Sequence, residues 1–187
     1  MTDTAATLAK PSRQQLLRQT LREAALWVAL AGALYGAAAV SGVRVVTTNS
    51  VPGVVYVRSF EPLARGTFVS FCPDLANPVL AAIKQRGHIE PGTCGPSMPF
   101  IKQVAALPGD HVELSAKGLS VNGDLLPKTA VLDTDRQGNP LPRIPFGAYV
   151  VAPGQAWVIA TNHPRSFDSR YYGPVQLRSL SPVRQLF

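Results

Sequence analysis

The stretch FIKQVAALPGDHVELSAKGLSVNG, residues 100–123, decides the fold class of this chain. Its apolar and β-branched residues fall into three short runs. Pro-Gly-Asp separates the first run from the second, Lys-Gly separates the second from the third, and Asn-Gly follows the third. Short runs bounded by such residues are typical of β-strands joined by tight turns. The stretch therefore predicts strands at residues 100–107, 111–115 and 119–121.

The rest of the C-terminal part follows the same pattern. Further strands are predicted at Val54–Phe60, Phe68–Cys72, Ala156–Thr161 and Val175–Leu180. One helix is predicted over 77–86, where Asn77 is a good N-cap, Pro78 suits the first helical position and Gly87 can end the helix. The proline-rich segment 125–155 is expected to be an irregular excursion from the sheet. The expected fold is a mainly β domain with one short helix.

Residues 24–43, AALWVALAGALYGAAAVSGV, form an apolar segment without a charge. Twenty residues in a helix span the hydrocarbon core of a bilayer, which is about 30 Å thick. The alternative is a cleaved secretory signal, for which the small residues 37–41 would be the cleavage site. The apolar run exceeds the usual signal core of about 7–15 residues, so the sequence favours a retained transmembrane anchor.

Basic residues set the expected orientation of this anchor. Lys10, Arg13, Arg18 and Arg22 precede it, and the positive-inside rule then keeps the N-terminus in the cytoplasm. The predicted organisation is a polar, loosely ordered cytoplasmic segment at 1–23, a transmembrane anchor at 24–43 and a periplasmic domain at 44–187. The protein is thus expected in the cytoplasmic membrane as a single-pass protein, with the lipid bilayer as a partner.

The charge of the chain has no pattern that favours nucleic acid. Its 187 residues carry a formal net charge of +7, spread along the chain rather than gathered in a block or interleaved with aromatic residues. A nucleic-acid partner is therefore not expected. A basic domain beside an anionic bilayer would be attracted to the head groups, which gives the charge a membrane explanation.

The two cysteines and three histidines of the chain bear on redox state and metal binding. Cys72 and Cys94 both fall in the part predicted to lie outside the cytoplasm, where a disulfide between them is the simplest interpretation. No histidine lies at metal-ligand spacing from a cysteine, so no zinc site is expected.

Two residues could supply nucleophilic catalysis. Ser50, in TTNSVPGVVY, follows the predicted anchor closely enough that it must sit near the membrane surface. Lys102 lies inside the apolar run FIKQVAAL, where Phe100 and Val104 would share its face of a strand. Burial there would lower the lysine pKa and make a neutral amine available as a base. Alternatively, Ser50 is a solvated loop residue, and Lys102 an edge-strand residue with its amine in water.

A third cluster, SFDSRYYGPV at residues 166–175, packs hydroxyls, a carboxylate, a guanidinium and phenols into a short loop. It is either a polar turn with a local ion pair of Asp168 and Arg170, or a shell that orients Lys102. A Ser-His-Asp triad must also be weighed, because His163 lies near Asp168 in sequence. His163 precedes a proline at a turn, and Lys102 is the favoured base.

These clusters, in this order behind one N-terminal apolar segment, resemble the type I signal peptidase superfamily and, more narrowly, its conjugative-transfer branch, the TraF-type peptidases that mature pilin precursors. The matching motifs are Ser50-Val51-Pro52 through Tyr56, 102–110, 166–174, Phe71-Cys72-Pro73 and Val121-Asn122-Gly123. One departure is visible, since Gly53 directly follows Pro52 and Val54 occupies the position where that branch usually has glycine.

The resemblance implies a signal-peptidase-like β domain and a serine endopeptidase with a Ser-Lys dyad. Ser50 would be the nucleophile and Lys102 the base, with Thr48 as an oxyanion donor. Ser166 would help to orient the lysine, and Asp168 and Arg170 would brace the loop. No metal or cofactor is required.

The implied substrate is an exported precursor protein, most specifically a conjugative pilin precursor, whose acyl group passes either to water or to the pilin's own N-terminus. The alternatives are a housekeeping signal peptidase and a non-catalytic, membrane-tethered assembly factor of a conjugation or secretion apparatus.

Overall fold

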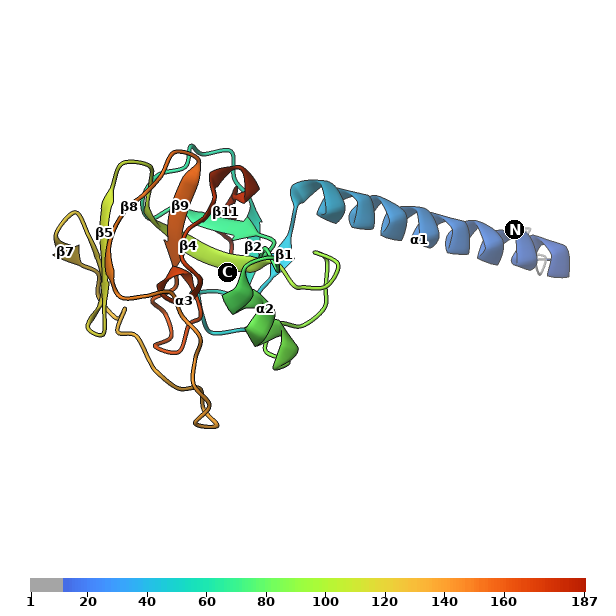
Figure 1. The fold of residues 1–187 in the computed structure, drawn as a ribbon. Coiled ribbons are helices and arrows are strands. Elements are labelled where there is room, and N and C mark those ends of the chain that lie inside the picture. Colours follow the sequence, from blue (N-terminus) through green and yellow to red (C-terminus); the bar gives the residue numbers. More distant parts are fainter. Residues whose placement is uncertain (1–11) are drawn as a thin grey trace, which may run out of the picture. The chain divides into compact units, whose positions relative to one another are not determined.

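The computed structural model describes residues 12–187, and the chain divides into two units, residues 1–42 and 43–187 (Figure 1). The described part of the first unit contains one long helix, α1, from Arg13 to Ser41. Ser12 caps it, because its hydroxyl accepts a hydrogen bond from the Gln15 amide at 3.3 Å while the Gln15 side chain accepts one from the Ser12 amide at 2.8 Å. This reciprocal pair is a capping box, a strong helix start.

This helix corrects part of the expected organisation. The segment 1–23 was expected to be loosely ordered, but residues 13–23 are helical, and residues 1–11 lie outside the described part. Within residues 12–187, we find no helix that combines the length and the apolarity needed to cross a membrane. The anchor expected at 24–43 is therefore not confirmed.

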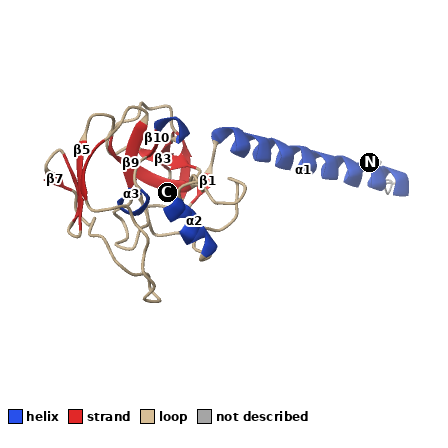
Figure 2. Ribbon diagram, viewed as in Figure 1, coloured by secondary structure: helices blue, strands red, loops and turns tan. Residues whose placement is uncertain are grey.

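The second unit is built from two antiparallel sheets, with strands drawn in red in Figure 2. In the described residues, the larger sheet has seven strands in the order β1-β2-β11-β3-β4-β9-β10. Their bounds are Arg44–Val45 (β1), Val55–Arg58 (β2), Phe68–Phe71 (β3), Phe100–Ala106 (β4), Gln155–Ile159 (β9), Val175–Gln176 (β10) and Ser181–Gln185 (β11). The smaller sheet has the order β7-β6-β5-β8. Its strands are His111–Ser115 (β5), Gly118–Val121 (β6), Asp124–Leu125 (β7) and Gly147–Val150 (β8).

Strand β4 lies inside the larger sheet, between β3 and β9. Its register pairs Lys102 with Val69 of β3 and Val104 with Val158 of β9. A mostly apolar run of seven residues can form such a strand because β4 is covered on both faces, and only its residues at 100 and 103 are partly exposed. The position of Lys102 in the sheet is therefore an interior one, not an edge.

Helix α2, Pro78–Gln85, covers part of this core. The Asn77 side chain accepts hydrogen bonds from the amides of Val79 at 3.0 Å and Leu80 at 3.3 Å, which confirms the predicted N-cap. Leu80 and Ile83 are buried against residues of β3, β4 and β9. The short helix α3, Ser169–Tyr172, packs beside β9 and α2.

Two expectations on secondary structure were partly wrong. The excursion 125–155 contains a regular strand, β8, which pairs with β5. The strand expected over 175–180 ends at Gln176, and residues Leu177–Ser179 form a 3-10 turn instead. The turn arises because the Leu177 amide donates to the Gly154 carbonyl at 2.7 Å, and the Leu180 amide then closes back on the Leu177 carbonyl at 3.1 Å.

Candidate active site

Ser50 lies in a turn between β1 and β2 and is partly exposed. The turn is fixed on both sides of the serine. Before it, the Asn49 carbonyl accepts a hydrogen bond from the Asn162 side chain at 2.9 Å. After it, Val51 is buried in a cluster with Tyr56 and Ile101, and the Tyr56 hydroxyl donates to the Pro52 carbonyl. The hydroxyl of Ser50 is therefore held on a braced backbone.

Gly53 explains the departure from the family motif. Its φ is +77°, a conformation that side chains with a Cβ rarely adopt. A Cβ there would lie 2.6 Å from the Gln185 side chain and still closer to the Phe187 carbonyl oxygen. That oxygen accepts hydrogen bonds from the amides of Val54 at 2.6 Å and Val55 at 3.2 Å. Glycine stands at 53 because the C-terminal strand runs against the turn at this point.

Lys102 is 5% exposed, and this confirms the burial predicted from its apolar neighbours. Burial lowers its pKa from 10.5 to about 8, while the charge of Asp168 raises the pKa and that of Arg170 lowers it. Its Nζ lies 5.5 Å from the centroid of the Phe100 ring. Within residues 12–187, Nζ forms no hydrogen bond or ion pair. A base with a pKa near 8 is deprotonated in about a tenth of molecules at pH 7.

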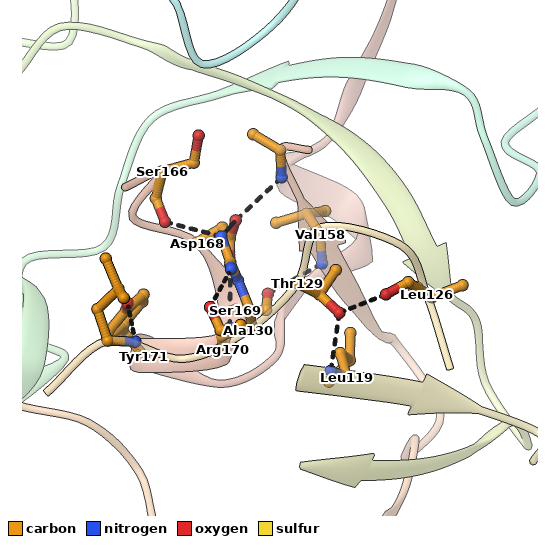
Figure 3. A network of polar contacts seen from close by, with 12 residues as sticks. Leu119, Leu126, Thr129, Ala130, Val158, Ser166, Asp168, Ser169, Arg170 and Tyr171 are labelled. Carbon is orange, nitrogen blue, oxygen red and sulfur yellow. Dashed lines mark hydrogen bonds and ion pairs between the residues drawn. The ribbon is translucent and has the colours of Figure 1, made fainter. Parts of the chain in front are cut away.

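The loop around Asp168 forms a polar network with a buried centre (Figure 3). Asp168 and Arg170 are both 0% exposed, and the carboxylate accepts hydrogen bonds from Arg170 Nε and Nη2, each at 2.8 Å. Arg170 also donates to the carbonyls of Ala130 and Ser166, both at 2.9 Å. These hydrogen bonds are compatible with the bracing role expected for Asp168 and Arg170, which stays a prediction.

The same loop is fastened to β9. The Ala160 amide donates to Asp168 Oδ2 at 3.0 Å, and the Val158 amide donates to the Ser169 hydroxyl at 2.9 Å. Since β9 pairs with β4, these bonds connect the loop to the strand that carries Lys102. Ser169 was not among the residues expected to matter, although its place between Asp168 and Arg170 could have suggested it.

The positions of Ser166 and Thr48 do not by themselves assign a catalytic role to either residue. The Ser166 hydroxyl is buried and donates to the His163 carbonyl at 2.7 Å, and in the described residues it has no hydrogen bond to Lys102. Thr48 is exposed and lines the same cavity as Ser50. The lysine-orienting role of Ser166 and the oxyanion role of Thr48 stay predictions.

His163 does not form the alternative triad. Its Nδ1 accepts a hydrogen bond from the Arg165 amide at 3.1 Å, and the Asp168 carboxylate is engaged by Arg170. In the part of the chain that the structure describes, His163 and Asp168 form no ion pair. The arrangement favours Lys102 as the base.

A cavity of about 650 Å³ adjoins Ser50. Ser50 and the three residues before it line this cavity together with Phe100, whereas Lys102 does not line it. Phe100, whose ring centroid lies 5.5 Å from Lys102 Nζ, thus borders the same cavity as Ser50. No direct hydrogen bond between Lys102 and Ser50 is present in the described residues. In free enzymes such catalytic bonds are often long and tighten only with substrate.

The walls of the cavity include residues that sequence reasoning missed. They come from the segment after α2, from the excursion and from the start of the terminal loop: His88, Ile89, Leu132, Asp135, Arg136, Gln137, Leu141 and Arg165. Only the tertiary fold brings these segments to Ser50, and no local sequence motif marks them.

The disulfide predicted between Cys72 and Cys94 is present, with Cα atoms 5.6 Å apart. The loop that it closes contains α2.

Comparisons with known proteins identify similar chains. The family model described as signal peptidase, peptidase S26, matches residues 15–185. A plasmid transfer protein TraF of Escherichia coli is 38% identical over 151 residues, covering 80% of this chain and 85% of the relative. A conjugal transfer protein TraF of Agrobacterium tumefaciens (strain 15955) is 36% identical over 146 residues, covering 76% and 80%. A solved signal peptidase I from Enterococcus faecalis V583 is 22% identical with a TM-score of 0.40, covering 68% of this chain and all of that structure.

Proposed function

The chain belongs to the signal peptidase family, peptidase S26, and from that premise we propose that it is a serine endopeptidase with Ser50 as nucleophile and Lys102 as general base. The observation that carries the proposal is the state of Lys102. It is a buried amine whose pKa is lowered to about 8, without a hydrogen-bonding partner in the described residues, beside the ring that borders the Ser50 cavity. A merely structural lysine at an interior position would be expected to have an ion-pair partner.

The proposed reaction is acyl transfer. Neutral Lys102 Nζ takes the proton of Ser50 Oγ, and Oγ forms a bond to the scissile carbonyl carbon. The Ser50 amide and the Thr48 hydroxyl donate to the resulting oxyanion. When the carbon–nitrogen bond breaks, the Lys102 ammonium returns its proton to the leaving amine. The neutral lysine can then activate the second nucleophile, which releases the acyl group from Ser50.

The proposed substrate is an exported precursor, most specifically a pilin-like precursor of a conjugation system. This proposal is supported by the similarity to plasmid and conjugal transfer proteins over more than three quarters of the chain. The second nucleophile would be either water or the N-terminal amine of the precursor, which would close a ring. The mass of the product separates these two fates, because hydrolysis adds one water and ring closure does not.

We propose that the catalytic unit acts on the periplasmic side of the cytoplasmic membrane. The bridge between Cys72 and Cys94 supports an oxidising compartment. Protease added to intact spheroplasts should then degrade residues 43–187. Protection of these residues would contradict this location.

The function is tested by incubating the membrane-inserted protein with pilin precursors and comparing the parent with Ser50→Ala by mass. The proposal expects cleavage by the parent and none by the variant. An assembly factor without activity would leave every precursor intact in both. A housekeeping signal peptidase would cleave unrelated exported precursors as fast as pilin precursors.

A further inference from the structure

The lining of the cavity beside Ser50 combines apolar and charged residues. The apolar ones are Ile83, Ile89, Phe100, Leu132, Leu141, Phe167 and Tyr171. Two solvent-exposed arginines from separate segments, Arg136 and Arg165, also line the cavity, and we call them the arginine pair. Two cations in the lining of one cavity favour a ligand of opposite charge.

The carboxylate within the cavity lining, Asp135, is already engaged. It accepts hydrogen bonds from the Gln137 amide at 2.8 Å and from both the amide and the side chain of Asn139 at 2.9 Å. His88 Nε2 lies 3.7 Å from it. These contacts, led by the Asn139 side chain, lower the pKa of Asp135. Asp135 therefore stabilises its own turn. In the described residues, neither arginine of the pair forms an ion pair with it or with another carboxylate.

Most N–H donors of the arginine pair have no acceptor among the described residues. Arg165 makes one long hydrogen bond, from Nη1 to the Thr134 carbonyl at 3.4 Å. In residues 12–187, the Arg136 side chain forms no hydrogen bond or ion pair. A guanidinium carries five N–H donors in a planar fork that matches a carboxylate. Arg170, in contrast, has its fork filled by Asp168 and serves as the internal example of a satisfied arginine.

The backbone beneath Arg136 is braced. Thr134 and Pro140 are bridged across the turn, and the Asp135 amide donates to the Asn139 carbonyl at 2.9 Å. From the end of α2, Arg86 Nη1 donates to the Pro140 carbonyl at 2.6 Å. The turn is thus tied to a second segment of the cavity wall, and it presents Arg136 from a fixed base.

We propose that the arginine pair binds a carboxylate of the substrate close to the scissile bond, while an apolar substrate side chain contacts the apolar residues of the same cavity. The carboxylate belongs either to an aspartate or glutamate side chain or to the C-terminus of the precursor. This inference rests on the proposed function and adds the chemical class of the substrate to it. A neutral substrate would be bound without this contact and hence more weakly.

The test uses peptides spanning a precursor cleavage site, presented to the full-length protein in detergent micelles. In one series a single glutamate, or glutamine as its match, is moved through the residues flanking the scissile bond. In a second series the C-terminus is a free acid or an amide. The enzymes are the parent, Arg136→Gln, Arg165→Gln, the double variant, and Arg178→Gln as a control for total charge, since Arg178 is exposed and does not line the cavity.

The expected result is a preference of about tenfold in kcat/KM for one carboxylate position over its neutral match, expressed mainly in KM. Each single arginine variant should reduce the preference, and the double variant should remove it. Arg178→Gln should keep it. The series that shows the preference identifies the source of the carboxylate.

Equal cleavage of every acidic and neutral pair by the parent would overturn the inference, as would a preference that survives in the double variant. Binding of the same peptides to Ser50→Ala measures the preference without cleavage. A carboxylate preference in binding without turnover by the parent would refute the proposed peptidase and keep this inference. Turnover by the parent without any carboxylate preference would support the proposed peptidase and refute this inference. A preference that appears only with anionic lipid would instead assign the arginine pair to head groups.

Discussion

The carboxylate of Asp168 holds the guanidinium of Arg170 at two points, Nε and Nη2, each at 2.8 Å, and neither side chain is exposed to solvent. The pair closes a loop that is also bonded to β9, the neighbour of the strand that carries Lys102. Burial lowers the pKa of Arg170, but the hydrogen bonds and charge of Asp168 raise it more. Arg170 therefore keeps its charge in the core.

Asp168→Asn should be strongly destabilising. The variant keeps the shape of the side chain but leaves a buried cation without its counter-charge, a loss that typically costs about 3–5 kcal/mol. Urea unfolding followed by tryptophan fluorescence measures it, with Asp124→Asn on the exposed strand β7 as a control. A loss of stability no larger than in the control would contradict the view that this pair braces the loop.

Lys102→Met should stabilise the fold near neutral pH. Below pH 8 both folded and unfolded chains hold the proton, so the folded state carries a buried charge that costs about 3 kcal/mol, given a pKa of about 8 in the fold. As the pH rises from about 8 to 10.5, the folded lysine loses its proton before the unfolded one and the cost disappears. The gain of the variant in unfolding free energy should fade over this range, and a gain independent of pH would refute the shifted pKa.

Gly53→Ala should cost more than Gly66→Ala. Both glycines have positive φ, +77° and +89°, but only Gly53 faces neighbouring atoms, those of Gln185 and Phe187. The change at Gly66 should cost about 1 kcal/mol from its backbone conformation alone. The change at Gly53 should cost more and also lower kcat, because the strained turn carries Ser50. Equal effects on stability with unchanged kcat would contradict the proposed role of the close contact.

Reduction of the bridge between Cys72 and Cys94 should destabilise the second unit by about 3 kcal/mol, because the closed loop spans 22 residues. Thiol labelling of unfolded, unreduced protein should find no reactive cysteine. Labelling at both positions in material from the native compartment would rule out the bridge and weaken the periplasmic location.

Local sequence patterns predicted the apolar strands that build the core. They did not predict strands that form only because a neighbouring strand offers hydrogen-bonding partners. FIKQVAAL is apolar enough to require burial on both faces, so β4 and the burial of Lys102 could be predicted. GAYV of β8 is mostly exposed and SPVRQ of β11 is mostly polar, and each is a strand because a partner is beside it. The helix start at Arg13 was not predicted, because it depends on the reciprocal hydrogen bonds of Ser12 and Gln15, which precede the apolar segment by at least nine residues.

Some residues of the candidate site could likewise be predicted from the sequence, and others could not. Ser50, Lys102 and Asp168 belong to motifs that are short in sequence, and resemblance was enough to select them. The roles of Arg136 and Asp135 depend on a turn that Pro140 and Arg86 fix from elsewhere in the chain. No spacing in the sequence relates that turn to Ser50, so the arginine pair was visible only in the structure.

The most direct test of the dyad is the single-turnover cleavage rate of a precursor across pH for the parent, Lys102→Arg, Lys102→Ala and His163→Ala. The parental rate should rise with pH along a limb set by the lowered Lys102 pKa, about 8, and level off above it. Lys102→Arg should be nearly as inactive as Lys102→Ala, because a guanidinium stays protonated and cannot take the Ser50 proton. His163→Ala should retain substantial activity. Near-parental cleavage by Lys102→Arg, or complete loss only in His163→Ala, would contradict the assignment of Lys102 as the base.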